Sequence, residues 1–156
     1  MIAARLLAWY SADHRDLPWR HTRDPYRIWV SEIMLQQTRA QAVIPYYRRF
    51  LESFPNIRAL AAASEEAVLA TWSGLGYYSR ARNLHKAAHQ MQGAFPTGYQ
   101  AIRDLPGVGD YTAAAISSIA FGLPYAVLDG NVMRVIARVL KNALRRSNPP
   151  MLDHRD

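Results

Sequence analysis

Two carboxylates and a glycine-rich turn between them are the residues of this chain with the clearest chemistry. Glu32 lies in residues 31–38, Asp129 lies in residues 128–132, and the sequence Leu-Pro-Gly-Val-Gly-Asp-Tyr-Thr occupies residues 105–112. A pair of carboxylic acids is the usual apparatus for breaking a glycosidic bond. A turn of this composition before a helix offers main-chain N–H groups to a phosphate. Together these features predict the release of a base from DNA.

Glu32 has two interpretations. On a helix, Ile28 and Leu35 share its face, which makes that face apolar. A buried ionised carboxylate is costly, so Glu32 must be paired, hydrogen-bonded or protonated. A raised pKa would make it a proton donor near neutral pH. The alternative is a salt bridge to one of the many arginines, and the residue by itself favours that alternative.

Asp129 also has a structural and a chemical interpretation. It follows the loop of residues 122–128 and precedes a helical segment. Aspartate is a good N-cap, as is asparagine, so Asp129 or Asn131 can start that helix. At the mouth of a loop, Asp129 could instead face a developing cation. By itself the position favours the cap.

The turn of residues 105–112 is more specific. Pro106 sets one bend, and Gly107 and Gly109 allow positive φ and close approach of a ligand. The helix from Tyr111 then begins with N–H groups that can hold a phosphate, a contact that positions DNA without selecting sequence. An ordinary glycine-containing turn between helices is the alternative. The short helix before the turn and the Ala-rich helix after it favour the phosphate site.

A second glycine-rich loop, residues 74–78, opens a helix that carries Arg80, Arg82, His85 and Lys86. Side chains at a loop tip can wedge into a base stack, and the arginines can take phosphates. A core Leu–Tyr pair beside a solvated basic face explains the same residues equally well. The polar residues 36–38, just past Glu32, could fill the hole left by a displaced base, although polar helix ends are common.

Helical spacing dominates the elements that must position these residues, and no clear alternating strand is present. Breaks carry proline or glycine, and Ser64 is expected to cap a helix. The expected helices are Ile2–Ala12, Tyr26–Gln37, Arg39–Ser53, Glu65–Ser73, Tyr77–Gln92, Tyr99–Asp104, Tyr111–Phe121 and Asn131–Asn142. We therefore expect one all-α domain over residues 1–142. Residues 143–156 lack periodicity and are expected to form a disordered tail.

Composition narrows the classes of protein further. The 156 residues carry a net charge of +7, almost entirely from arginine, which suits a polyanionic partner. There is no cysteine, which excludes disulfides and thiolate metal sites within the chain. His85 and His89 have helical spacing but no third ligand, so we expect no metal. No stretch is long enough to cross a membrane and no signal peptide is evident, so a cytoplasmic location is expected.

At this point several motifs together resemble the adenine DNA glycosylases of the MutY type, within the helix-hairpin-helix superfamily. The resemblance rests on residues 17–20, 31–38, 74–83, 105–112 and 128–138, in collinear order from about residue 5 to 141. It implies an all-α, two-lobed domain with a central groove, acting on double-stranded DNA as a nucleoid-associated monomer. The implied reaction is monofunctional removal of adenine mispaired with 8-oxoguanine or guanine.

The resemblance also implies roles for individual residues. Glu32 would protonate N7 of a flipped adenine and then help to activate water, while Asp129 would stabilise the cationic sugar. The remaining catalytic residues would be Tyr111 and Asn131. DNA contacts would come from Gln37, Thr38, Leu75, Tyr77, Gly107, Val108 and Gly109. The base pocket would be lined by Arg15, Trp19, Arg20 and Leu35.

Two other functions remain open. A bifunctional glycosylase–lyase of the endonuclease III type needs a lysine where this chain has Tyr111, which disfavours it. A non-catalytic DNA-binding fragment is the second alternative, because the family's four cysteines for a [4Fe-4S] cluster and its 8-oxoguanine-reading domain have no counterpart here. The resemblance is therefore to a truncated relative without a cofactor, in which we expect slow excision and poor mispair discrimination.

Overall fold

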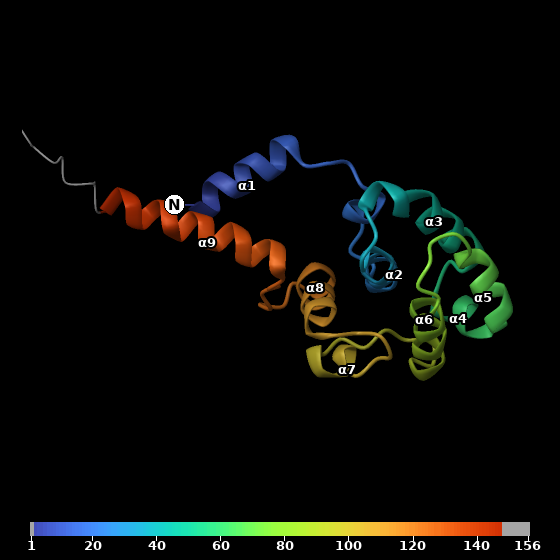
Figure 1. Ribbon diagram of the computed structural model, residues 1–156. Coiled ribbons are helices and arrows are strands. Elements are labelled where there is room, and N and C mark those ends of the chain that lie inside the picture. The colour runs from blue at the N-terminus through green and yellow to red at the C-terminus, as the bar shows by residue number, and fades with distance from the viewer. Residues whose placement is uncertain (1, 148–156) are drawn as a thin grey trace, which may run out of the picture. The chain divides into compact units, whose positions relative to one another are not determined.

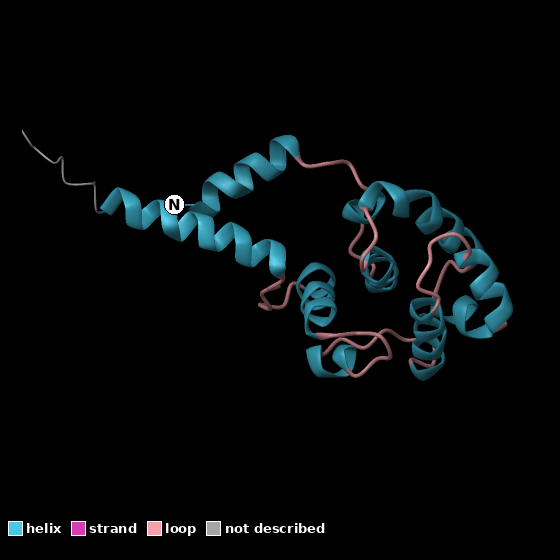
Figure 2. Ribbon diagram, in the orientation of Figure 1, coloured by secondary structure: helices cyan, strands magenta, loops and turns pink. Residues whose placement is uncertain are grey.

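The computed structural model describes residues 2–147, with side chains described through Lys141. This part of the chain contains α-helices, one short 3₁₀ helix and no strand, as Figure 2 shows, so the all-α prediction is confirmed for it. The elements are α1 (Ile2–Asp13), η1 (Pro18–His21), α2 (Pro25–Leu35), α3 (Ala40–Ser53), α4 (Ile57–Ala62), α5 (Glu65–Trp72), α6 (Ser79–Gln90), α7 (Tyr99–Arg103), α8 (Asp110–Phe121) and α9 (Gly130–Ser147).

Local chemistry explains where the helices begin. Asp24 caps α2, since its carboxylate accepts a hydrogen bond from the N–H of Tyr26 at 2.9 Å, and Pro25 occupies a first-turn position that needs no N–H. Ser64 caps α5 by accepting from the N–H of Ala67 at 3.1 Å. The cap predicted at Ser64 is confirmed.

Three elements differ from the sequence prediction. Helix α4 was not predicted, yet Asn56 starts it by accepting from the N–H of Ala59 at 2.9 Å. The 3₁₀ helix η1 was also missed, because four residues are too few to show periodicity. Helix α9 ends at Ser147 instead of Asn142, since the first proline that opposes a helix comes at Pro149. The tail prediction for residues 148–156 lies outside the described residues.

Helix α2, which carries Glu32, lies at the centre of the first of two compact units, residues 1–125 (Figure 1). It packs against η1, α3, α6 and α8, and α6 packs in turn against α4 and α5. The largest fully buried side chains are Trp29 of α2, Trp72 of α5 and Phe50 of α3. A helix held on several sides keeps the residues at its end in fixed positions.

The chain divides into these two compact units after Tyr125. Within the first unit, α1 buries no residue, and Ile2, Leu7 and Trp9 are more than half exposed. The second unit, residues 126–156, contains α9, whose apolar Met133 and Leu140 are likewise exposed. Both terminal helices thus present apolar side chains at their surfaces.

Candidate acid–base site and nucleic-acid interface

Glu32 lies on the last turns of α2 and is half-buried. Burial raises the pKa of its carboxyl group to about 7. No ion pair to Glu32 is present among the described side chains, and loss of solvation is the cause of the shift. The prediction that Glu32 forms a salt bridge with an arginine is therefore wrong for the described part of the chain. A carboxyl group that is half protonated near neutral pH can act as a general acid.

This burial predicts that Glu32→Gln stabilises the protein in a pH-dependent way. The folded pKa is raised from 4.5 to about 7, so the folded state binds more protons than the unfolded chain between those values. The unfolding free energy of the parent therefore falls as pH rises through that window, by up to about 3 kcal/mol. Glutamine carries no charge and avoids this loss. Urea denaturation at about pH 8 should show the variant as more stable, with the difference vanishing toward about pH 4.

The exposed Glu66, on the first turn of α5, supplies a matched control. Glu66→Gln should change stability little, and without the same trend between the two pH values. A stability difference for Glu32→Gln that is equal at both pH values would show that Glu32 does not titrate between them.

Asp129 caps α9, as the simpler sequence interpretation predicted. Its carboxylate accepts from the N–H groups of Val132 at 2.8 Å and Asn131 at 3.0 Å, and from the Asn131 side-chain amide at 3.1 Å. These hydrogen bonds, that of Val132 first, hold the pKa of Asp129 below its ordinary value. Asp129 is therefore a fixed anion at neutral pH, and Asn131 supports it directly. Those are the properties that a group opposite a developing cation needs.

The turn before α8 depends on the conformation of Gly107. Gly107 has φ of +77°, and a Cβ there would lie 2.9 Å from the Cβ of Asn83 on α6. Val108 anchors the turn, since its side chain is buried and its N–H donates to the Leu105 carbonyl at 3.1 Å. No side chain caps the first turn of α8. The main chain of Gly107 and Gly109 therefore lies exposed beside the positive end of a helix.

Gly107→Ala should destabilise the protein by roughly 1–3 kcal/mol, because the new side chain takes a left-handed conformation and meets Asn83. Gly109→Ala is the matched control, since Gly109 has φ of −99° and open space around it. Chemical denaturation of both variants tests this expectation. Equal unfolding free energies for the two variants would mean that the turn adapts to a side chain.

Tyr111 lies on the first turn of α8 and is 43% exposed. Its neighbour Asp110 pairs with Arg103 and accepts from the hydroxyl of Tyr99 at 3.2 Å, so the carboxylate nearest the turn is neutralised by a cation. This pairing lowers the repulsion that Asp110 would otherwise exert on a phosphate.

Two predicted DNA-contacting residues occupy strained backbone positions at the surface. Gln37 has φ of +55° and Tyr77 has φ of +50°, both in the left-handed region that side chains other than glycine rarely adopt. Gln37 is exposed, and Tyr77 is 61% exposed. Strain of this kind collects at ligand-contacting sites. Thr38, beside Gln37, is half-buried.

Leu75 and Arg80 differ from the sequence interpretation. Leu75 was predicted to contact DNA from the loop tip, but it is only 8% exposed and belongs to the hydrophobic core. For Arg80 the sequence left a phosphate contact and a solvated basic face equally open, but the side chain is buried and donates to main-chain carbonyls. Arg82 pairs with Glu65 instead of standing unpaired. Of the two hydrophobic candidates in this loop, Tyr77 is therefore the exposed one.

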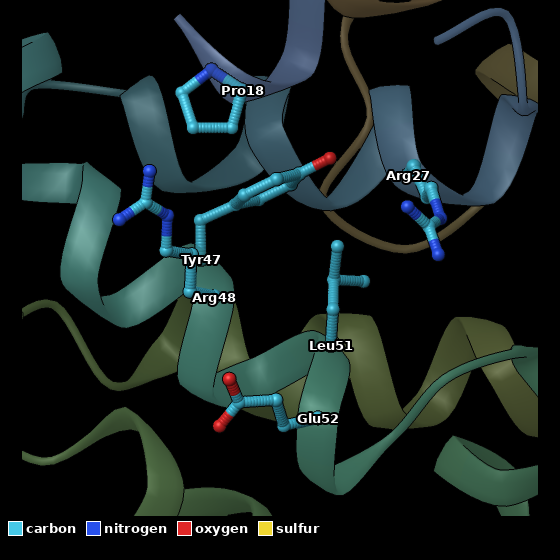
Figure 3. A pocket seen from close by; sticks show the side chains of 6 residues that line it. All are labelled: Pro18, Arg27, Tyr47, Arg48, Leu51 and Glu52. Atoms are coloured by element: carbon cyan, nitrogen blue, oxygen red, sulfur yellow. The ribbon is translucent and has the colours of Figure 1, made fainter. Parts of the chain in front are cut away.

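The predicted base-pocket residues lie in two environments. Trp19 is buried against Tyr47, with ring centroids 5.4 Å apart, and Leu35 is half-buried at the end of α2. Arg15 and Arg20 are exposed, and Arg20 donates to the Arg15 carbonyl at 2.9 Å. A cavity of about 280 Å³ is present, but the residues that line it are not the predicted ones. Figure 3 shows them: Pro18, Arg27, Tyr47, Arg48, Leu51 and Glu52.

No group of three or more His, Asp or Glu side chains suited to a metal ion is present among the described residues. An iron–sulfur cluster needs thiolate ligands, and the chain has no cysteine, so these residues do not fit such a cluster. Within the described residues, no helix combines the length and hydrophobicity that crossing a membrane requires.

Comparison with curated proteins finds similar chains in bacteria and animals. Residues of this chain are 47% identical to an adenine DNA glycosylase of Buchnera aphidicola over 138 positions, which cover 85% of this chain and 39% of the relative. The adenine DNA glycosylases of Mus musculus and Homo sapiens are each 47% identical, with 29% and 27% of their lengths covered. The chain thus spans well under half of the length of these relatives.

Solved structures share the fold. A thermostable thymine-DNA glycosylase matches with a TM-score of 0.81 and 36% identity, over 86% of this chain and 64% of that one. A trapped endonuclease III–DNA covalent intermediate matches with a TM-score of 0.73 and 25% identity, over 85% and 63%. The predicted helix-hairpin-helix glycosylase fold is confirmed. Residues 30–149 match the model of the "HhH-GPD superfamily base excision DNA repair protein" family, and the chain belongs to that family.

Proposed function

We propose that this chain is a monofunctional DNA glycosylase that removes adenine mispaired with 8-oxoguanine or guanine. The observation that carries the proposal is Glu32, a half-buried carboxyl group with a pKa of about 7 and no ion-pair partner among the described side chains. An acid of this kind is what departure of a purine requires, because a protonated base is a far better leaving group.

The proposed reaction has two steps. Protonated Glu32 gives its proton to N7 of a flipped adenine, and the bond from N9 to C1′ of the sugar breaks with its electron pair going to the base. Water then adds to the cationic C1′, and the Glu32 carboxylate takes the proton that this water loses. The products are adenine and an abasic sugar, and Glu32 is again protonated.

Asp129 is proposed to stabilise the cationic sugar between these steps. Its depressed pKa and its hydrogen bonds from Asn131 and Val132 support a fixed negative charge that needs no rearrangement during reaction. Tyr111 and Asn131 are proposed to support the same reacting centre.

The DNA contacts follow from the exposed turns. The main chain of residues 107–109 binds a phosphate, and Gln37 and Tyr77 enter the base stack as the adenine leaves it. Arg15, Trp19, Arg20 and Leu35 are proposed to surround the extruded base. The partner is duplex DNA with an adenine mispair, bound by a monomer at the nucleoid.

The choice of adenine rests on the relatives, which are adenine DNA glycosylases in bacteria and animals. A panel of duplexes tests it, with A opposite 8-oxoguanine, G or T, and T opposite G, each incubated with excess protein. Free adenine should appear slowly from the duplexes with A opposite 8-oxoguanine or G, with only a small preference over A opposite T, and no thymine should be released from the T:G duplex. Release of thymine from the T:G duplex would replace adenine by thymine as the substrate; a thymine-DNA glycosylase is among the solved structures that share the fold.

Borohydride trapping distinguishes a monofunctional enzyme from a lyase. Lyase chemistry needs an amine that forms a Schiff base with the abasic sugar, and Tyr111 stands at the position where endonuclease III-type enzymes carry that lysine. We therefore expect no covalent protein–DNA adduct when the reaction is run with borohydride. An abundant adduct on a denaturing gel would assign the chain to the bifunctional class.

A further inference from the structure

Arg80, on the first turn of α6, is a buried arginine without a carboxylate partner among the described residues. It is 8% exposed, and its guanidinium lies over the rings of Trp72 and Tyr77, 5.4 and 5.2 Å from their centroids. A buried cation is costly unless its donors are satisfied. Nε of Arg80 has no acceptor within the described part of the chain, but Nη1 and Nη2 donate mostly to main-chain carbonyls, so the guanidinium holds segments of backbone in place.

The two terminal nitrogens of Arg80 together reach two segments of the chain. Nη1 donates to the carbonyls of Ile33, Met34 and Gln36, at 3.1, 2.9 and 2.6 Å. Nη2 donates to the Thr38 hydroxyl at 3.3 Å and to the carbonyls of Leu75 and Gly76 at 3.4 and 3.2 Å. One side chain therefore joins the end of α2 to the loop before α6.

The carbonyls that Arg80 holds include those directly before the two strained surface residues. Gln36 precedes Gln37, with φ of +55°, and Gly76 precedes Tyr77, with φ of +50°. A carbonyl belongs to the peptide plane that leads into the next residue, so fixing it limits the rotation of that residue. Both strained conformations are thus restrained by the same guanidinium.

We infer that Arg80 is a positioning residue that sets Gln37 and Tyr77 at a fixed separation, so that both enter the base stack together when a base is extruded. The inference rests on the proposed function, and Arg80 itself touches no reacting atom. A wedge of two preset side chains loses less conformational freedom on binding than two mobile ones. Lysine cannot substitute, because one ammonium group cannot reach all the acceptors that Nη1 and Nη2 share between them.

The test measures base extrusion separately from excision. A duplex with 2-aminopurine in place of the target adenine, opposite 8-oxoguanine, fluoresces more strongly when that base leaves the stack. The unstacking equilibrium is measured with saturating protein for the parent, Arg80→Lys and Arg49→Lys, each with and without Tyr77→Ala. Arg49 is the matched control, since it donates to the carbonyls of Thr71 and Ser73 and lies over the ring of Tyr46.

Loss of one stacking side chain should lower unstacking about tenfold or more. We expect Tyr77→Ala to have that effect in the parent and in Arg49→Lys. In Arg80→Lys, unstacking should already be low, and Tyr77→Ala should lower it by less than about twofold. A purely structural role would reduce the amount of folded protein and leave the Tyr77→Ala factor unchanged, which would overturn the inference.

Two further outcomes are separable. If Arg80→Lys does not fold, Thr38→Val takes its place, because it removes one Nη2 acceptor without shortening a buried side chain. The decrease in unstacking that Tyr77→Ala causes must then be smaller in Thr38→Val than in the parent. An equal decrease in both counts against the inference. If the parent binds the duplex without any rise in fluorescence, the proposed function fails and the inference fails with it. If fluorescence rises with the parent but Tyr77→Ala lowers unstacking equally in the parent and in Arg80→Lys, the inference about Arg80 fails and the proposed function stands.

Discussion

Glu32→Gln should abolish excision of adenine while leaving DNA binding nearly unchanged. Glutamine keeps the shape of the side chain and cannot deliver a proton, and general-acid catalysis of this kind contributes about 10²–10⁴-fold to a rate. The group affected is well defined, because the pKa of Glu32 is raised to about 7 by burial and no ion pair shares its charge among the described side chains. Single-turnover excision on an 8-oxoguanine:A duplex, with protein in excess, measures the effect.

The dissociation constant of the same duplex, from fluorescence anisotropy, separates chemistry from binding. Glu66→Gln is again the control, since Glu66 is exposed on α5. Equal single-turnover rates for Glu32→Gln and the parent would remove Glu32 from the chemistry. A large loss of affinity in Glu32→Gln would point to a role in binding instead.

Asp129→Asn should slow excision by a factor on the order of 10²–10³, the effect typical of removing one preorganised electrostatic contact from a transition state. The substitution isolates charge, because asparagine is as good an N-cap as aspartate and α9 should keep its start. The Asp129 carboxylate accepts hydrogen bonds from the N–H groups of Asn131 and Val132. The amide oxygen of asparagine in the same place accepts the same two hydrogen bonds. Single-turnover excision and thermal unfolding should therefore respond differently, with a large loss of rate and a small change in Tm.

Asp24→Asn is the matched control for that change. Asp24 caps α2 as Asp129 caps α9, so it tests the loss of a capping charge outside the proposed site. The role of Asp129 would be contradicted if both substitutions slowed excision equally, or if neither did.

Residue types alone predicted much of the scaffold and only part of the site. The cap at Ser64, the long helices and the turn of residues 105–109 carry local signals, since cap residues, periodicity and glycine act over a few positions. Helix α4 has six residues, which is too short for periodicity, although Asn56 after Pro55 was a usable start signal. The separate environments of Glu32 and Asp129 depend on burial and on hydrogen bonds that only the folded chain supplies.

Arg80 shows what local reasoning missed and why. Beside Arg82 it resembles one of a pair of surface cations, but Arg80 shares a helical face with Leu84, at i+4, and Ala87, at i+7. Both of those residues are buried, and so is Arg80, whereas Arg82 is exposed. The periodicity of α6 was therefore a signal that could have placed Arg80 inside. Its acceptors at Gln36 and Gly76 come from two distant segments and could not be predicted from the sequence.

The central claim is that half-buried Glu32 supplies the proton for departure of adenine near neutral pH. The rate of single-turnover adenine release by the parent chain on an 8-oxoguanine:A duplex, measured from about pH 5 to about pH 9, tests that claim most directly. Because the pKa of Glu32 is about 7, the rate should fall from a plateau, reach half of it near that pH, and then drop about tenfold per pH unit. The residual rate of Glu32→Gln, about 10²–10⁴-fold lower, should show no such fall. A parent rate that stays constant across this range, or a fall that Glu32→Gln shares, would contradict the account.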